Sequence, residues 1–221
     1  MMILFTSFWN PVLISLQTAF TALLLIFILG TLLGRIMSRS RFPGKTIVET
    51  LFILPTVLPP TVIGFLLIIV LGANGWLGQV IDFFFQQSLM FTWSATVIVA
   101  VVVGFPFMYQ SVKTGLAAVE PEIEEAARVS GASEWQVFFY ISMPMIARSL
   151  VTGVILSFSR AIGEFGATFM FAGNIPGTTQ TMPIAIFTAL EAGDTTLAWA
   201  WVIVIVLLSF SLLFFVRKFS D

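Results

Sequence analysis

Two side chains of opposite charge interrupt a long apolar stretch in the C-terminal half of the sequence. Arg160 and Glu164 are four residues apart, so on a helix they share a face and can form an ion pair. Charged groups within a membrane are costly, and they commonly pair with each other or line a path for ions. Either Arg160 faces a passing anion while Glu164 reduces its affinity, or the two side chains neutralise each other and hold helices together. We favour the second interpretation.

Residues 115–144 form the one long polar interval of the chain. Four of the eleven acidic residues lie within six positions, at 120, 122, 124 and 125, and Pro121 follows the first of them. A proline at the first helical position, with carboxylates in the first turn, predicts the start of a helix. Gly131 is placed to end this helix, and a second helical run over 134–141 closes at Pro144. We expect a helical elbow outside the lipid, with Ala126 and Ala127 on a smooth face.

The residue types that are absent exclude several kinds of chemistry. The chain has no cysteine and no histidine, which removes Cys/His metal sites, thiol chemistry and nucleophiles activated by histidine. The tripeptide Gly44-Lys45-Thr46 resembles the end of a phosphate-binding P-loop, but that motif needs a glycine where Arg39 stands. We therefore expect no metal, cofactor or nucleotide on this chain, and no covalent catalysis.

The polar interval resembles the EAA loop of the membrane subunits of ABC importers. The likeness rests on Glu125-Ala126-Ala127, on Gly131 four positions later, and on the closing segment Ile141-Ser142-Met143-Pro144. Met143 stands where leucine is usual in that family, a change that conserves volume. The alternative is an ordinary amphipathic connector. The resemblance implies that an ATPase subunit couples to the following residues: Glu124, Glu125, Ala126, Ala127, Gly131, Ala132 and Pro144.

The composition indicates a membrane protein. Of the 221 residues, 58% are hydrophobic and 10% are charged, whereas soluble domains average about 25% charged residues. The mean hydropathy is +1.05. We predict an all-α polytopic membrane protein, one permease domain over 1–221, and the resemblance implies the transmembrane fold of a type I ABC importer with a cytoplasmic coupling loop at 115–144. About five transmembrane helices are expected, at residues 11–35, 48–71, 94–112, 145–171 and 195–216.

The distribution of basic residues predicts the orientation in the membrane. With five spans and the elbow inside the cell, nine of the ten basic residues are cytoplasmic, and the tenth, Arg160, lies within a span. The excess of lysine and arginine in cytoplasmic loops supports this arrangement, with the N-terminus outside and the C-terminus inside. An extra crossing over 79–93 would place the basic cluster of 35–45 outside, so we expect this segment to lie at the interface. The nine are Arg35, Arg39, Arg41, Lys45, Lys113, Arg128, Arg148, Arg217 and Lys218.

Two further segments could line a translocation pathway. Pro55, Pro59 and Pro60 must break or kink the second span, and irregular backbone at membrane depth requires cover from protein or a water-filled cavity. A kinked structural helix is the alternative. The second segment is the polar loop 173–181, which offers amide and hydroxyl donors suited to an oxyanion; its alternative is a re-entrant turn or a surface that docks a binding protein. The candidate pathway residues are Arg160, Glu164, Pro59, Pro60, Asn174, Thr178, Thr179 and Gln180.

The runs GEFGAT, FAGNIPG and TQT, between residues 163 and 181, are similar to those of the molybdate-permease branch of the same family. This resemblance implies a homodimer in a prokaryotic plasma membrane, with two cytoplasmic ATPase subunits that hold ATP and Mg, an extracytoplasmic oxyanion-binding protein, and no nucleic acid. Tungstate and sulfate are alternative substrates. A stand-alone secondary carrier is a further alternative, but the chain shows no internal repeat and only one intramembrane charge pair.

The predicted outer side carries Asp82, Glu191 and Asp194 and no basic residue. Such a mouth repels anions over about 10 Å. An importer of a dianion would then need a separate protein to capture and deliver it.

Overall fold

The computed structural model describes residues 2–220, with side chains described for all of these except 2–7, 85, 212, 213 and 215–220. Every regular element in this range is helical, which confirms the predicted fold class. In chain order the helices are α1 (Met2–Arg39), α2 (Lys45–Ile53), η1 (Leu54–Thr56), α3 (Pro60–Leu71), α4 (Trp76–Phe85), α5 (Trp93–Ala117), α6 (Pro121–Val129), α7 (Glu134–Val137), η2 (Phe138–Ser142), α8 (Met143–Met145), α9 (Ala147–Ile162), α10 (Gly166–Phe171), α11 (Met182–Glu191) and α12 (Thr195–Ser220).

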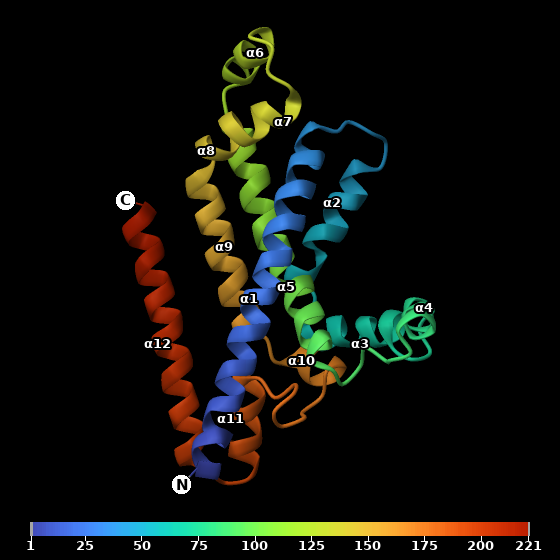
Figure 1. Cartoon of the computed structure of the whole chain (residues 1–221), viewed down its shortest axis with the longest axis vertical. Coiled ribbons are helices and arrows are strands. Elements are labelled where there is room, and N and C mark those ends of the chain that lie inside the picture. Colours follow the sequence, from blue (N-terminus) through green and yellow to red (C-terminus); the bar gives the residue numbers. More distant parts are fainter. Residues whose placement is uncertain (1, 221) are drawn as a thin grey trace.

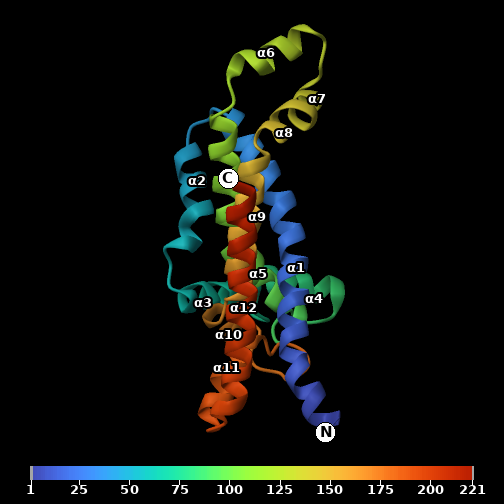
Figure 2. The same ribbon diagram turned by 90° about the vertical axis from the view of Figure 1, so that its left-hand side faces the viewer.

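Four long helices, α1, α5, α9 and α12, run along the long axis of the molecule (Figures 1 and 2). The core between α1 and α5 contains small side chains, and Ala19, Ala22 and Ala100 are almost completely buried. A Cβ atom on Gly30 of α1 would lie 2.7 Å from Met108 Cγ of α5, so only glycine allows this close approach. Small residues at such crossings are typical of helices that pack within membranes.

The chain breaks within the expected span 48–71, as the prolines predict. α2 ends at Ile53, the short turn η1 contains Pro55, and α3 begins at Pro60. Proline lacks a backbone N–H and collides with the preceding turn, so a helix cannot continue through this segment. The chain bends by 118° between the helical segments before and after the break, and α3 lies across the bundle axis (Figure 1).

The segment 145–171, predicted as one span, contains two helices. The helical stretch Glu134–Met145 bends by 76° into α9, α9 ends at Ile162, and a separate helix, α10, begins at Gly166. Glycine at 163 weakens helix continuation. The side chain of Glu164 then accepts a hydrogen bond at 2.8 Å from the backbone N–H of Ala167, which stabilises a new helix start.

The helices α3, α4 and α10 form a group beside the bundle (Figure 1). A Cβ atom on Gly64 of α3 would lie 2.8 Å from Met170 Cβ, so α3 and α10 pack closely. α4 has 10 residues and is about 15 Å long, half the thickness of a bilayer core. Trp76 and Phe83 of α4 are 68% and 80% exposed. This short exposed aromatic helix fits the interfacial segment expected at 79–93.

The two ends of the bundle carry different charges. The elbow lies at one end, together with the C-terminal end of α1, whereas the N-terminus and the turn between α11 and α12 lie at the other end (Figure 1). The elbow end therefore holds the basic residues of α1, and the turn at the opposite end holds Glu191 and Asp194. Arg217 and Lys218, expected on the cytoplasmic side, lie outside the described side chains.

By length and composition, Phe8–Arg39 and Trp93–Ala117 are long and apolar enough to cross a membrane, and each of the two bent pairs could supply one further crossing.

Candidate functional site

The N-terminal half of the elbow has the helix start and end that the sequence predicts, whereas its C-terminal half differs from the prediction. Pro121 occupies the first turn of α6, and Gly131 follows this helix with a φ of 92°, a conformation that favours glycine. A capping box between Ser133 and Gln136 starts α7. The second helical run does not close at Pro144, because proline is tolerated in the first turn of α8 and the bend comes at Ile146.

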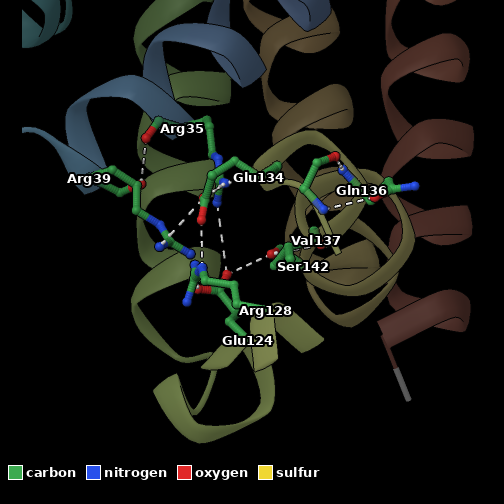
Figure 3. Close-up of polar contacts among 10 residues, drawn as sticks. Arg35, Arg39, Glu124, Arg128, Glu134, Gln136, Val137 and Ser142 are labelled. Atoms are coloured by element: carbon green, nitrogen blue, oxygen red, sulfur yellow. Dashed lines mark hydrogen bonds and ion pairs between the residues drawn. The ribbon is translucent and has the colours of Figure 1, made fainter. Parts of the chain in front are cut away.

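Five charged side chains fasten this elbow to the end of α1 (Figure 3). We call this set the latch: Arg35 and Arg39 from α1, Glu124 and Arg128 from α6, and Glu134 from α7. Arg35 and Arg39 are four residues apart and therefore lie on one face of α1. Three guanidinium groups thus share two carboxylates that come from different helices, so the latch needs α1, α6 and α7 in one arrangement.

Glu124 is the buried centre of the latch, with its side chain 11% exposed. Its carboxylate is paired with Arg39 and Arg128, the latter at 3.3 Å, and Arg35 is 3.8 Å away. The hydroxyl of Ser142 also donates a hydrogen bond of 2.6 Å to this carboxylate. A buried carboxylate with this many partners holds one position, because by moving it would lose the cations that compensate its charge.

Glu134 is the more exposed carboxylate of the latch, at 59%. It accepts hydrogen bonds from Arg128 at 2.5 Å and from Arg35 at 3.0 Å. The hydrogen bond from Arg128 is the main reason why the pKa of Glu134 is lowered, against the opposing effect of burial.

The elbow exposes several apolar and aromatic side chains in addition to its carboxylates. Val129 at the end of α6 is 89% exposed, and Trp135, Phe139 and Tyr140 are 60%, 52% and 78% exposed. Trp135 and Phe139 stack with ring centroids 5.8 Å apart. An exposed patch of this kind at the tip of a protein is typical of a surface that binds another protein.

The predicted pair of Arg160 and Glu164 is present, with 2.5 Å between Arg160 Nη1 and Glu164 Oε2. It lies at the end of α9 rather than in the middle of a helix. Glu164 is 3% exposed and also caps α10, so it connects the two helices. The proline break lies close by, since a Cβ atom on Gly166 would be 3.0 Å from Pro60 Cβ.

Comparison with known proteins identifies the family. Residues 26–221 match the family described as binding-protein-dependent transport system inner membrane component. The chain belongs to this family. It is 56% identical over 213 residues to a putative molybdenum transport system permease protein, YvgM, of Bacillus subtilis, with 96% of this chain and 94% of that protein covered. It is 37% identical to the molybdenum transport system permease protein ModB of Escherichia coli, with 96% and 93% covered.

Sulfate permeases are also similar. The sulfate transport system permease protein CysT of Escherichia coli is 36% identical over 208 residues, covering 94% of this chain and 75% of that protein. The chain is therefore an ABC importer permease subunit of the molybdate and sulfate group.

Solved structures share the fold of the permease. A bacterial ABC transporter involved in the import of the acidic polysaccharide alginate superposes with a TM-score of 0.76 at 16% identity, covering 97% of this chain and 79% of that chain. The methionine ABC transporter MetNI, in an inward-facing conformation, superposes with a TM-score of 0.72 at 16% identity, covering 95% and 93%. The fold is thus that of type I ABC importer transmembrane domains.

The predicted coupling residues of the permease do not share one surface. Glu124 turns inward to the latch, whereas Glu125, Ala126, Gly131 and Pro144 are exposed. The two remaining predicted residues, Ala127 and Ala132, are half-buried. Sequence reasoning missed the contacts that Arg35 and Arg39 make with the elbow. It also missed those that Arg128, Glu134 and Ser142 make within the elbow. The signal available was the i,i+4 pair of arginines at the end of α1.

The polar loop of the permease bonds mainly to itself. Asn174 donates to the Thr188 hydroxyl at 3.0 Å and accepts from the Gln180 side chain at 2.9 Å. The hydroxyl of Thr179 is buried and accepts from the N–H of Ile175 at 2.9 Å. Thr178 is exposed. The amides and hydroxyls that were predicted to face an anion therefore form a hydrogen-bonded turn. The other candidate pathway residues, Pro59, Pro60, Arg160 and Glu164, lie at the breaks between η1 and α3 and between α9 and α10.

Proposed function

We propose that this permease imports molybdate, which an extracytoplasmic binding protein delivers and a separate ATPase subunit drives across the membrane. The observation that carries the proposal is the 56% identity to a putative molybdenum transport permease along nearly the full length of both chains. Sulfate is the second candidate, because a sulfate permease is 36% identical over most of this chain. Tungstate has nearly the same size and charge as molybdate and remains an alternative substrate.

The elbow is the proposed point at which ATP hydrolysis acts on this chain. Its exposed aromatic patch offers a contact for the ATPase, and the latch transmits force from that contact to α1. Rigid transmission requires that α6 and α7 keep their position relative to α1, which the buried carboxylate of Glu124 favours. ATP and Mg would be held by the ATPase, so this chain moves its substrate without covalent chemistry.

The proposed assembly contains two copies of the permease, two ATPase subunits and one binding protein in a prokaryotic plasma membrane, with the elbow inside and the N-terminus outside. The chain shows no internal repeat, so two copies are the simplest arrangement that could close a central pathway. The acidic turn between α11 and α12 would face outward. This charge disfavours direct capture of a dianion and supports delivery by a binding protein.

The decisive experiment is uptake of labelled molybdate by vesicles that contain the permease, its ATPase and its binding protein. We expect saturable uptake that requires ATP and the binding protein, that excess tungstate suppresses, and that sulfate suppresses weakly. Equal suppression by sulfate would favour the sulfate candidate. ATP-independent uptake by the permease alone would contradict the proposal and support a secondary carrier.

A further inference from the structure

A groove of about 490 Å³ lies between α5 and α9, beside the break at η1. Most of its lining surface is apolar, but six of its nine lining residues carry an uncharged polar group, one is cationic and none is acidic. The polar and charged groups of the two long helices belong to Gln110, Ser111, Thr114, Arg148, Ser149 and Thr152. We infer that this groove is an oxyanion vestibule, through which a hydrated tetrahedral oxyanion leaves toward the elbow side. The inference rests on the proposed function and adds a substrate site to it.

Helix spacing and two glycines build the groove. Gln110 and Thr114 are one helical turn apart on α5, and Ser149 and Thr152 are similarly placed on α9, so each helix presents a polar stripe. Gly115 brings the helices together, since a Cβ atom there would lie 2.8 Å from the Cβ of Ser149. Across the contact, a Cβ atom on Gly153 would lie 2.9 Å from Ser111 Cβ. The serine hydroxyls therefore lie where α5 and α9 approach most closely.

Arg148 supplies a positive charge that forms no ion pair with any carboxylate that the structure describes. Of the eight basic side chains that the structure describes, six form ion pairs, and Arg148 and Arg41 form none. Arg160, the cation that the sequence singled out, is neutralised by Glu164 at 2.5 Å. With no acidic residue in the lining, the groove attracts anions and disfavours cations.

Several donors in the groove are free to bind oxygen atoms. Among the described hydrogen bonds, none involves the side chains of Gln110, Ser111, Thr114 or Ser149. The hydroxyl of Thr152, by contrast, donates to the carbonyl of Arg148 at 3.0 Å. An unpartnered amide and three unpartnered hydroxyls beside a guanidinium match the needs of a tetrahedral oxyanion, which has acceptors in all directions.

The size of the groove predicts weak binding. The groove volume of 490 Å³ is many times the space that one water molecule needs, so an oxyanion enters with much of its hydration shell. Contacts through water do not require the groove to match the shape of the oxyanion. We therefore expect the groove to bind the oxyanion weakly and to release it readily. Such behaviour suits the exit end of an importer, whereas tight selection suits the binding protein.

Thiol labelling can test the vestibule, because the chain contains no native cysteine. Ser149→Cys places a single thiol in the groove of the full-length protein. We expect an anionic methanethiosulfonate to label it faster than a cationic one of similar size, and molybdate to slow the labelling. A unit charge about 4 Å away changes the local concentration of an ion by roughly fivefold in water. Arg148→Gln should therefore lower the anion-to-cation rate ratio by a factor that approaches this value as the distance between charge and thiol approaches 4 Å.

Arg41→Gln, which removes the other described cation without an ion pair, is the matched control and should leave the ratio unchanged. Equal ratios with and without Arg148 would overturn the inference. So would a thiol that reacts with neither reagent, since protein would then cover the groove.

Labelling needs no partner protein, so the two proposals fail separately. If molybdate slowed the labelling but the complete transporter took up no molybdate, the vestibule would stand and the proposed substrate would be contradicted. Uptake that Arg148→Gln leaves unchanged, together with an unchanged labelling ratio, would keep the proposed function and remove the vestibule.

Discussion

Glu124→Gln tests whether the latch holds the elbow in place. The substitution preserves the size of the side chain and removes its charge, so three guanidinium groups would share the single carboxylate of Glu134. It also weakens the hydrogen bond that Ser142 donates at 2.6 Å, because the acceptor is no longer charged. The expected consequence is a local release of α6 and α7 from α1, without loss of the bundle.

The magnitude follows from the burial of the partners. Removal of one member of a fully buried ion pair costs about 3–5 kcal/mol. The side chains of Arg39 and Arg128 are 38% and 28% exposed, so water can solvate them once they are freed. We therefore reduce the expected cost to about 2 kcal/mol, which corresponds to a roughly 30-fold increase in the open population of the elbow.

Amide hydrogen exchange of the purified protein in a lipid bilayer measures this population. Exchange from α6 and α7 should accelerate about 30-fold when local opening is fast, while exchange from the middle of α5 should remain unchanged. Glu125→Gln is the matched control, because Glu125 is exposed and forms no ion pair among the described residues. A change below threefold, or an equal change in the control, would refute the latch.

Three further predictions concern the helix contact, the buried pair and pH. Gly115→Ala should lower the thermal unfolding midpoint, at a cost of about 1–3 kcal/mol, because the new Cβ atom would lie 2.8 Å from Ser149 Cβ; an unchanged midpoint would show that α5 and α9 separate freely. Arg160→Met should cost about 3 kcal/mol by leaving buried Glu164 without a cation. Adding Glu164→Gln to Arg160→Met should recover most of the lost stability. A double variant no more stable than Arg160→Met alone would contradict the interpretation that Arg160 and Glu164 form a structural ion pair. The pKa of Glu134 is lowered in the folded state, so its stabilising effect is complete above the ordinary glutamate pKa of about 4.3 and is lost as the pH falls through the lower folded value; Glu134→Gln should abolish this acid-dependent step in the exchange of α7 amides.

Local signals in the sequence predicted much of the fold. Pro121 and Gly131 determine where α6 begins and ends, since each acts through the backbone of its own turn. The prolines from 55 to 60 break the second apolar segment for the same reason. The break at Gly163 was missed because a single glycine in an apolar run is compatible with a continuous helix. The new helix start is stabilised by the hydrogen bond that the backbone N–H of Ala167 donates to the Glu164 carboxylate, a contact that the sequence does not reveal.

The latch and the vestibule depend on contacts between residues distant in sequence, which a single sequence does not reveal. Arg39 and Glu124 are 85 positions apart. The basic cluster that contains Arg39 is explained by orientation in the membrane, and the acidic cluster that contains Glu124 is explained by the start of a helix, so neither cluster alone indicates a contact between them. Arg148 was likewise counted as one of nine cytoplasmic cations. Arg148 is recognised as the cation of the groove only from the packing of α9 on α5 and from the pairing of the carboxylates near the elbow with other cations.

The connections between elbow and groove suggest how movement of one changes the other. α5 continues into α6 after Ala117, and α8 continues into α9 through the bend at Ile146, so the elbow extends both walls of the groove. The latch and the buried alanine core join α6, α1 and α5 into one unit, whereas α9 meets the elbow through a 76° bend. Force on the elbow therefore reaches α9 through this bend, and any change in the position of α9 against α5 would widen or narrow the oxyanion vestibule.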